Sequence, residues 1–177
     1  GEESESELLD SDVACVSQTG TPNNGGVGLS LANCTFENPC GPTDFSQTGV
    51  NTLNSLLPNT LMFFNGGTYN ALDATGSNPI TLNSGQGVNA RTADYSQAAT
   101  GSGRSVFNGA FILNTNNTLA NIILLPTAAT ASGTGVTDNN GTNDFIRGSQ
   151  IGNINNLYNV GVVISTNQLT ITNSVIF

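Results

Sequence analysis

The sequence has almost no positive charge. It contains three Arg and neither Lys nor His. Proteins that bind nucleic acids or anionic membranes use clustered Lys and Arg, so the composition argues against both kinds of partner. Without His, a serine nucleophile would lack its usual base. The sequence also has no CxxC motif, so we expect no metal site and no cofactor.

Negative charge is concentrated at the beginning of the chain. The chain has 12 acidic residues and a net charge of −9, but six of the acids fall within residues 1–12. The other six acids and the three Arg leave the body at −3. We therefore expect 1–12 to be a disordered acidic tail. No apolar run approaches the ~18–20 residues of a membrane span, so we expect no membrane contact by this segment.

Strong helix formers are also scarce after residue 12, whereas turn-forming residues are abundant. The chain has 26 Asn, 22 Thr and 21 Gly, and its Val, Ile, Leu and Phe come in short runs. Asn, Gly and Thr favour turns and left-handed corners, so the composition predicts an all-β fold. Only 44–57 has apolar residues at helical spacing, which predicts one short helix that ends before Pro58.

Two stretches of the chain resemble each other. Residues 110–126 and 161–177 both read as a strand, a polar corner and a second strand. Aligning them places Phe111 on Val162, Asn114 on Ser165, Asn116 on Asn167, Leu119 on Ile171 and Asn121 on Asn173. This repeated unit is typical of a β-solenoid, in which Asn side chains stack at the corners. A β-sandwich or jelly roll is the alternative.

The repeat divides the chain into three parts. Residues 1–12 are the tail, 13–57 an N-terminal cap and loop, and 58–177 the rungs of the solenoid. The last apolar run, 174–177, would be an open edge strand, so we expect the protein to continue beyond it. Two polar excursions, 89–104 and 127–143, are predicted to be loops and are the candidate contact regions.

The three cysteines leave several pairings open. Cys34 and Cys40 bracket a loop sequence, whereas Cys15 lies in an apolar run. We favour a Cys34–Cys40 disulfide over Cys15–Cys34, and three free thiols are the remaining alternative. A disulfide would indicate an oxidising compartment.

The order of several motifs resembles the N-terminal part of passenger regions in autotransporter and adhesin-type surface proteins of Gram-negative bacteria. The motifs are Asn23–Gly26, Asn38-Pro39, Leu61–Phe64, Gly67-Thr68-Tyr69 and Ile80–Gln86. The resemblance implies a single-stranded right-handed parallel β-helix that is secreted or displayed on the bacterial surface. It also implies binding of a host protein or glycan, further rungs and a membrane anchor. One departure is that Asn38-Pro39 runs into Cys40, where the family more often has Phe.

Enzymes on the same fold are the competing interpretation. A glycoside hydrolase needs two carboxyl groups facing one sugar bond, and Asp138 and Asp144 could converge. A polysaccharide lyase needs a basic group near carboxylates, for which Arg91 with Asp94 or Arg147 with Asp144 is the nearest approximation. We favour turn or cap roles for Asp138 and Asp144, and local surface ion pairs for Arg91 with Asp94 and for Arg147 with Asp144. The sequence therefore predicts no catalytic residues.

Overall fold

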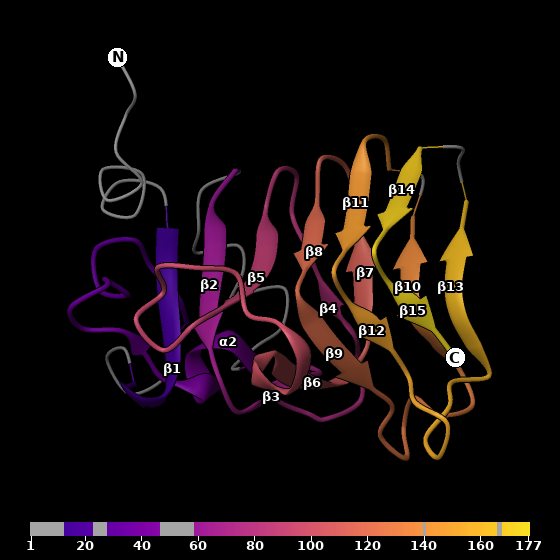
Figure 1. Cartoon of the computed structure of the whole chain (residues 1–177), viewed down its shortest axis with the longest axis horizontal. Helices are drawn as coiled ribbons and strands as arrows, with labels where there is room; N and C mark the ends of the chain where they lie inside the picture. The colour runs from indigo at the N-terminus through magenta and orange to yellow at the C-terminus, as the bar shows by residue number, and fades with distance from the viewer. Residues whose placement is uncertain (1–12, 23–27, 47–58, 140, 166–167) are drawn as a thin grey trace.

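The computed structural model describes residues 13–22, 28–46, 59–139, 141–165 and 168–177, and it is built almost entirely of β-strands (Figure 1). The largest of its three sheets has six strands in the order β1-β2-β5-β8-β11-β14. These strands are β1 (Val13–Thr21), β2 (Leu61–Asn65), β5 (Gly87–Arg91), β8 (Thr118–Ala120), β11 (Asp144–Arg147) and β14 (Leu169–Thr172). We call this the first sheet.

The other two sheets follow the same rule. The second sheet has five strands: β3 (Thr68–Ala71), β6 (Ser105–Gly109), β9 (Ile122–Leu125), β12 (Gln150–Ile151) and β15 (Val175–Ile176). The third sheet has four strands: β4 (Ile80–Thr81), β7 (Phe111–Leu113), β10 (Thr134–Asp138) and β13 (Val160–Ile164). The helical elements of the described chain are α2 (Pro42–Ser46) and the 3-10 turn η2 (Gly101–Gly103).

From β2 onward the chain visits the three sheets in turn, and every third strand returns to the same sheet. All pairings between these strands are parallel. The all-β prediction is therefore confirmed. A sandwich of hairpin-linked antiparallel strands, the alternative, does not fit parallel pairing of this kind.

The sequence repeat corresponds to strand register. Phe111 pairs with Val136, and Val136 pairs with Val162. In the first sheet, Leu119 and Ile171 both pair with Ile146. The aligned residues thus share a column, as predicted, but with one further strand between them. The interval of about fifty residues between the two similar stretches therefore spans two structural repeats.

The intermediate strand β10 was missed in the prediction that 127–143 is a loop. Residues 134–138 pair with both β7 and β13. The segment Thr-Gly-Val-Thr-Asp has one large apolar residue, Val136, which leaves too weak a signal for a strand. The prediction for 89–104 is wrong at its start, because β5 continues to Arg91. Within 13–57, which we predicted to be a cap and loop, β1 forms a strand that runs to Thr21.

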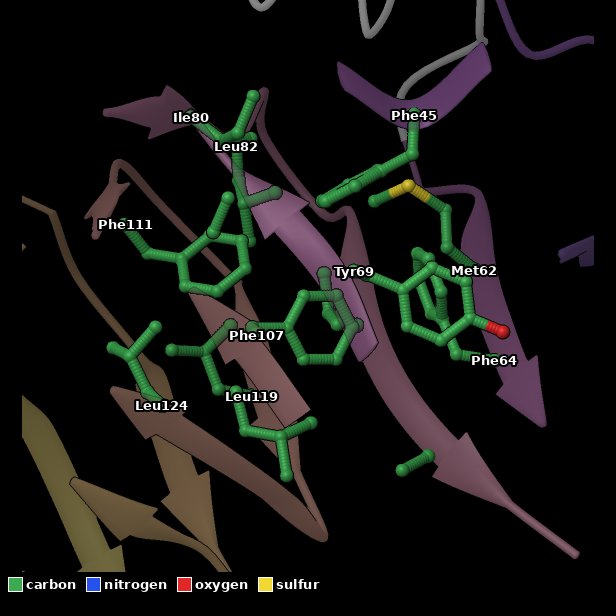
Figure 2. Packing of buried hydrophobic residues seen from close by; sticks show 14 of the residues in the cluster. Phe45, Met62, Phe64, Tyr69, Ile80, Leu82, Phe107, Phe111, Leu119 and Leu124 are labelled. Carbon is green, nitrogen blue, oxygen red and sulfur yellow. The ribbon is translucent and has the colours of Figure 1, made fainter. Parts of the chain in front are cut away.

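Most of the stretch 44–57 predicted to be helical, residues 47–57, lies outside the described residues, and the helix that is described, α2, begins at Pro42. Phe45 of α2 is fully buried in the interior between the sheets (Figure 2). Its ring contacts Phe64 at 4.9 Å and Phe107 at 5.7 Å between centroids. Phe64 and Phe107 are themselves 4.9 Å apart. This aromatic cluster fills the interior near the beginning of the chain.

Asparagines form the corners next to the first sheet. Asn59, Asn116, Asn121, Asn143 and Asn173 have positive φ angles, a conformation that Asn tolerates better than most residues. The Asn143 side chain donates to that of Asn116 at 2.9 Å, so part of the predicted Asn stacking is present. Asn167, which the sequence alignment placed on Asn116, lies outside the described residues.

Candidate functional site

The N-terminal edge of the first sheet is covered by the loop that holds the disulfide. Cys34 and Cys40 are disulfide-bonded, which is the pairing that the sequence favoured. The Cys15 N–H donates to the Cys34 carbonyl at 2.9 Å, and the Thr21 N–H donates to Pro39 at 3.1 Å. The Cys15 thiol is buried, and burial, followed by the charge of Glu37, raises its pKa to about 12. Cys15 is therefore an unreactive packing residue.

A second apolar cluster lies on the outer face of the first sheet. It consists of Val13, Cys15, Phe63 and Tyr95, with Leu61 packed against it. Tyr95 belongs to the excursion after β5, and its hydroxyl donates to the Val16 carbonyl at 2.8 Å. This excursion crosses in front of β1 and β2 in Figure 1. Residues 92–104 are thus a segment fixed against the sheet by packing and a buried hydrogen bond.

Arg91 at the end of β5 holds the base of this excursion. Its guanidinium lies over the Phe63 ring, 4.6 Å from the centroid. Its Nε donates to the Tyr95 carbonyl and its Nη2 to the Ser96 carbonyl, both at 3.0 Å. Two contacts and a ring therefore fix the plane of the guanidinium, so that its position is preorganised.

The predicted ion pair between Arg91 and Asp94 is absent. Asp94 instead accepts hydrogen bonds from the Thr92 hydroxyl at 2.9 Å and from the Ser96 hydroxyl at 2.6 Å. These bonds, together with the Ser96 N–H, lower its pKa to about 2. Asp94 is a turn residue, so the surface ion pair that we favoured for it is wrong.

A groove lies between the excursion and the N-terminal strands. Its volume is about 830 Å³, and it is lined by residues 17–19, 65–67, 91–93, 97–100 and 103. Hydroxyl and amide side chains dominate the polar lining, and Arg91 is the only charged residue among the lining residues. Its apolar lining residues are alanines. The groove is therefore a concave surface with one cation in its lining.

The other candidate pair, Asp138 and Asp144, does converge. Both side chains are fully buried, and the two carboxyl groups interact with each other. Asp144 Oδ1 accepts from the Asn117 N–H at 2.7 Å, and Asp138 Oδ1 accepts from the Gly141 N–H at 3.1 Å. Neither Oδ2 atom has a hydrogen-bond partner among the described residues. A proton shared between the two carboxyl groups satisfies these oxygens.

The buried position of the two carboxyl groups favours the protonated form of Asp144. Burial raises the pKa of Asp144 to about 6, with a further contribution from the hydrogen bond and charge of Asp138, while the Asn117 N–H opposes the shift. Two carboxylates cannot both ionise cheaply in one enclosed corner. Because the pair is sealed from solvent, it cannot reach a sugar bond, and this site does not support glycoside hydrolysis.

Arg147 does not pair with Asp144. Along β11 the side chains alternate between the interior and the surface, and Asp144 is buried whereas Arg147 is exposed. The period-two geometry of a strand puts residues three apart on opposite faces, so the predicted ion pair is wrong.

No protein-family model matches the chain, and no curated protein or solved structure shows significant similarity to it. No helix among the described residues is long and apolar enough to cross a membrane. Those residues also contain no group of three or more His, Cys, Asp or Glu that could hold a metal ion.

The sequence named the excursion 89–104 as one of two candidate contact regions but did not indicate the groove. It singled out 89–104 from its polarity, but it did not indicate that Tyr95 anchors the segment or that Gln18 and Asn65 face it. The available signal was a single Tyr within a polar stretch, because a buried tyrosine ring usually covers an apolar surface while its hydroxyl finds an acceptor.

Proposed function

We propose that the chain is part of a single-stranded right-handed parallel β-helix that serves as the passenger or adhesin region of a secreted or surface-displayed protein. Support for the architecture comes from three parallel sheets that the chain visits in turn, with matched residues in one column. Backbone hydrogen bonds along the column and apolar side chains inside it would make such a stack rigid.

The chemistry of the surface fits an extracellular setting. The described chain contains a disulfide, which persists in oxidising compartments. The body of the chain carries little charge, and Lys is missing altogether. The further rungs and membrane anchor that the resemblance implies belong to the same proposal.

Binding of a protein or glycan through the lateral face is the activity that we propose, and the groove beside residues 92–103 is the observation that carries it. The excursion is held in place by Tyr95 and Arg91, so that the groove exists before a ligand arrives. A preformed concave surface lowers the ordering cost of binding.

The test is binding of the chain to a panel of immobilised glycans and extracellular proteins. Gly66 lines the groove, and a Cβ added there would meet no atom within 4 Å. Gly66→Tyr should therefore place an aromatic ring at the groove without a clash at its Cβ, and we expect it to abolish binding of the panel members that the wild-type chain recognises.

Gly133→Tyr is the matched control. Gly133 lies outside the groove, and a Cβ there would meet only the Thr130 carbonyl, at 3.6 Å. This variant should bind as the wild type does. Equal binding by Gly66→Tyr and the wild type, or no binding to any member of the panel, would contradict the proposed function.

A further inference from the structure

We infer that the groove beside residues 92–103 recognises a saccharide that carries carboxylate groups, with Arg91 contacting the carboxylate. This inference rests on the proposed binding function and specifies the ligand class for the same groove. It is carried by the position of the one cation, the amide and hydroxyl groups in the lining and the charge of the rest of the protein.

One nitrogen of the Arg91 guanidinium is available to a ligand. Its Nε and Nη2 are used by backbone carbonyls, whereas Nη1 has no hydrogen-bond partner in the described part of the chain. No carboxylate of the described residues forms an ion pair with Arg91, because Asp94 is occupied by its own turn. A fixed guanidinium without a counter-ion in a groove favours an anionic ligand group, and carboxylate oxygens match its planar donors.

The remaining lining suits sugar hydroxyls. Gln97 and Thr100 supply an amide and a hydroxyl. The amide nitrogens of Gln18 and Asn65 donate to the Thr68 and Ala93 carbonyls, so these two side chains offer acceptor oxygens. Together the lining presents donors and acceptors for the hydroxyls of a sugar ring.

A peptide is a poorer fit to the same groove. Peptide recognition depends on apolar or aromatic anchors, or on a free strand edge, and the apolar lining residues here are alanines. Two backbone N–H groups of β1 on either side of the groove, those of Cys15 and Thr21, already donate to the Cys34 and Pro39 carbonyls.

The net charge of the protein limits the number of negative charges that a bound saccharide can carry. The body of the chain has a net charge of −3 and the groove has one Arg, so a densely charged polyanion would be repelled overall. A saccharide with one carboxylate per two sugar units places a single charge at Arg91 and neutral hydroxyls elsewhere. This ligand matches both the cation and the polar lining.

The test uses an oligosaccharide in which glucuronic acid alternates with an N-acetylated neutral sugar, and the same oligosaccharide after reduction of its carboxyl groups to alcohols. Binding is measured by calorimetry with the full chain. We expect carboxyl reduction to weaken binding to the wild-type chain by about tenfold or more, the value of one charge-assisted contact.

Arg91→Gln is the matching variant, with its folding checked by thermal unfolding. It should bind the native and the reduced oligosaccharide equally. Gly66→Tyr, which keeps Arg91 and its contacts, should bind neither and covers the case in which Arg91→Gln fails to fold.

Three results would overturn the inference: equal wild-type binding of both oligosaccharides, a carboxylate preference that survives in Arg91→Gln, or stronger binding of poly-glutamate than of the oligosaccharide. Each of them leaves the proposed function standing if another member of the panel binds in a manner that Gly66→Tyr abolishes. Loss of all binding overturns both.

Discussion

At the scale of single residues, the enclosed carboxyl pair makes stability depend on pH. The folded state raises the pKa of Asp144 from 3.8 to about 6, so between these values the folded protein holds a proton that the unfolded chain releases. The stabilisation from this proton is complete below about pH 4 and is lost as the pH rises to about 6. After allowance for solvent screening, we expect a loss on the order of 1–2 kcal/mol in the free energy of unfolding.

Asp144→Asn tests this expectation. The asparagine oxygen keeps the bond from the Asn117 N–H, and its amide group donates to Asp138 in place of the shared proton. The variant should lose the slope between pH 4 and 6 in urea-unfolding measurements and should be more stable than the wild type at pH 7. Asp94→Asn is the control, because Asp94 titrates near pH 2 and should leave the slope unchanged. A slope that persists in Asp144→Asn would refute the shared proton.

Gly141 allows the corner between β10 and β11 to close. A Cβ at this position would overlap the Asn114 carbonyl and the Asp144 carboxylate. Gly141→Ala should therefore destabilise the protein by more than about 2 kcal/mol in chemical denaturation, since backbone cannot move aside as a flexible side chain does. Gly133→Ala, where the new Cβ would be in ordinary contact, should stay within about 0.5 kcal/mol of the wild type. Similar losses in both variants would contradict the assigned role of Gly141.

The candidate residues show how far composition and spacing reach. Asp138 and Asp144 could be named from the sequence, because they bracket one segment. Their burial could not be predicted from the sequence. In the strand register, Asp144 lies in one column with Asn117 and Gln86 of the two preceding repeats, and this column of polar residues is not visible in the sequence. The ion pair predicted for Asp94 failed because Asp94 bonds within its own turn, and the ring contact of Arg91 depends on Phe63 of a different strand.

At the scale of elements, the excursion after β5 is held by Tyr95. Its hydroxyl donates to the Val16 carbonyl in a buried position. Tyr95→Phe should keep the packing but leave that carbonyl without its donor, at a cost of about 1–2 kcal/mol in the free energy of unfolding. We also expect faster proteolytic cleavage within 92–103, measured by limited digestion. Ala93→Ser, an exposed change in the same segment, is the control and should alter neither quantity.

The elements that the sequence predicted well are those with consecutive large apolar residues. Residues 61–64 and 111–113 have such runs, and both are strands. Strand β10 lacks one because a neighbour supplies the missing volume. The Tyr158 ring would lie 3.0 Å from a Cβ at Gly135, and its hydroxyl donates to the Gly109 carbonyl at 2.6 Å. Gly135 leaves room in the strand for the ring of Tyr158, which comes from a later connection. A local sequence pattern does not contain this pairing.

At the scale of the whole molecule, the repeat was visible because each column preserves side-chain volume at intervals. Phe111, Val136 and Val162 share a column, and the first and last of them are bracketed by similar sequence. The number of repeats was not visible, because the middle one is polar at its corner. In the last repeat the strands β13, β14 and β15 each lie at the end of a sheet, and Val163, Ile164 and Ile171 are exposed there.

The aromatic cluster unites the sheets near the beginning of the chain, and it yields the last prediction. Phe107 is fully buried and contacts the rings of Phe45, Phe64, Tyr69 and Phe111. Phe107→Ala would leave a cavity at the point where α2 meets the interior, and large-to-small changes of this kind cost about 3–5 kcal/mol.

Phe145→Ala removes the same atoms from an outward-facing, 38 % exposed position and is the matched control. Denaturation followed by far-ultraviolet circular dichroism should show a large loss of stability for Phe107→Ala and a loss below about 1 kcal/mol for Phe145→Ala. Each strand is hydrogen-bonded to the next strand of its sheet. We therefore expect the β-sheet signal to be lost in a single transition, at a lower denaturant concentration than in the wild type. A variant in which only part of that signal melts early would show that the repeats near α2 unfold independently of the later ones.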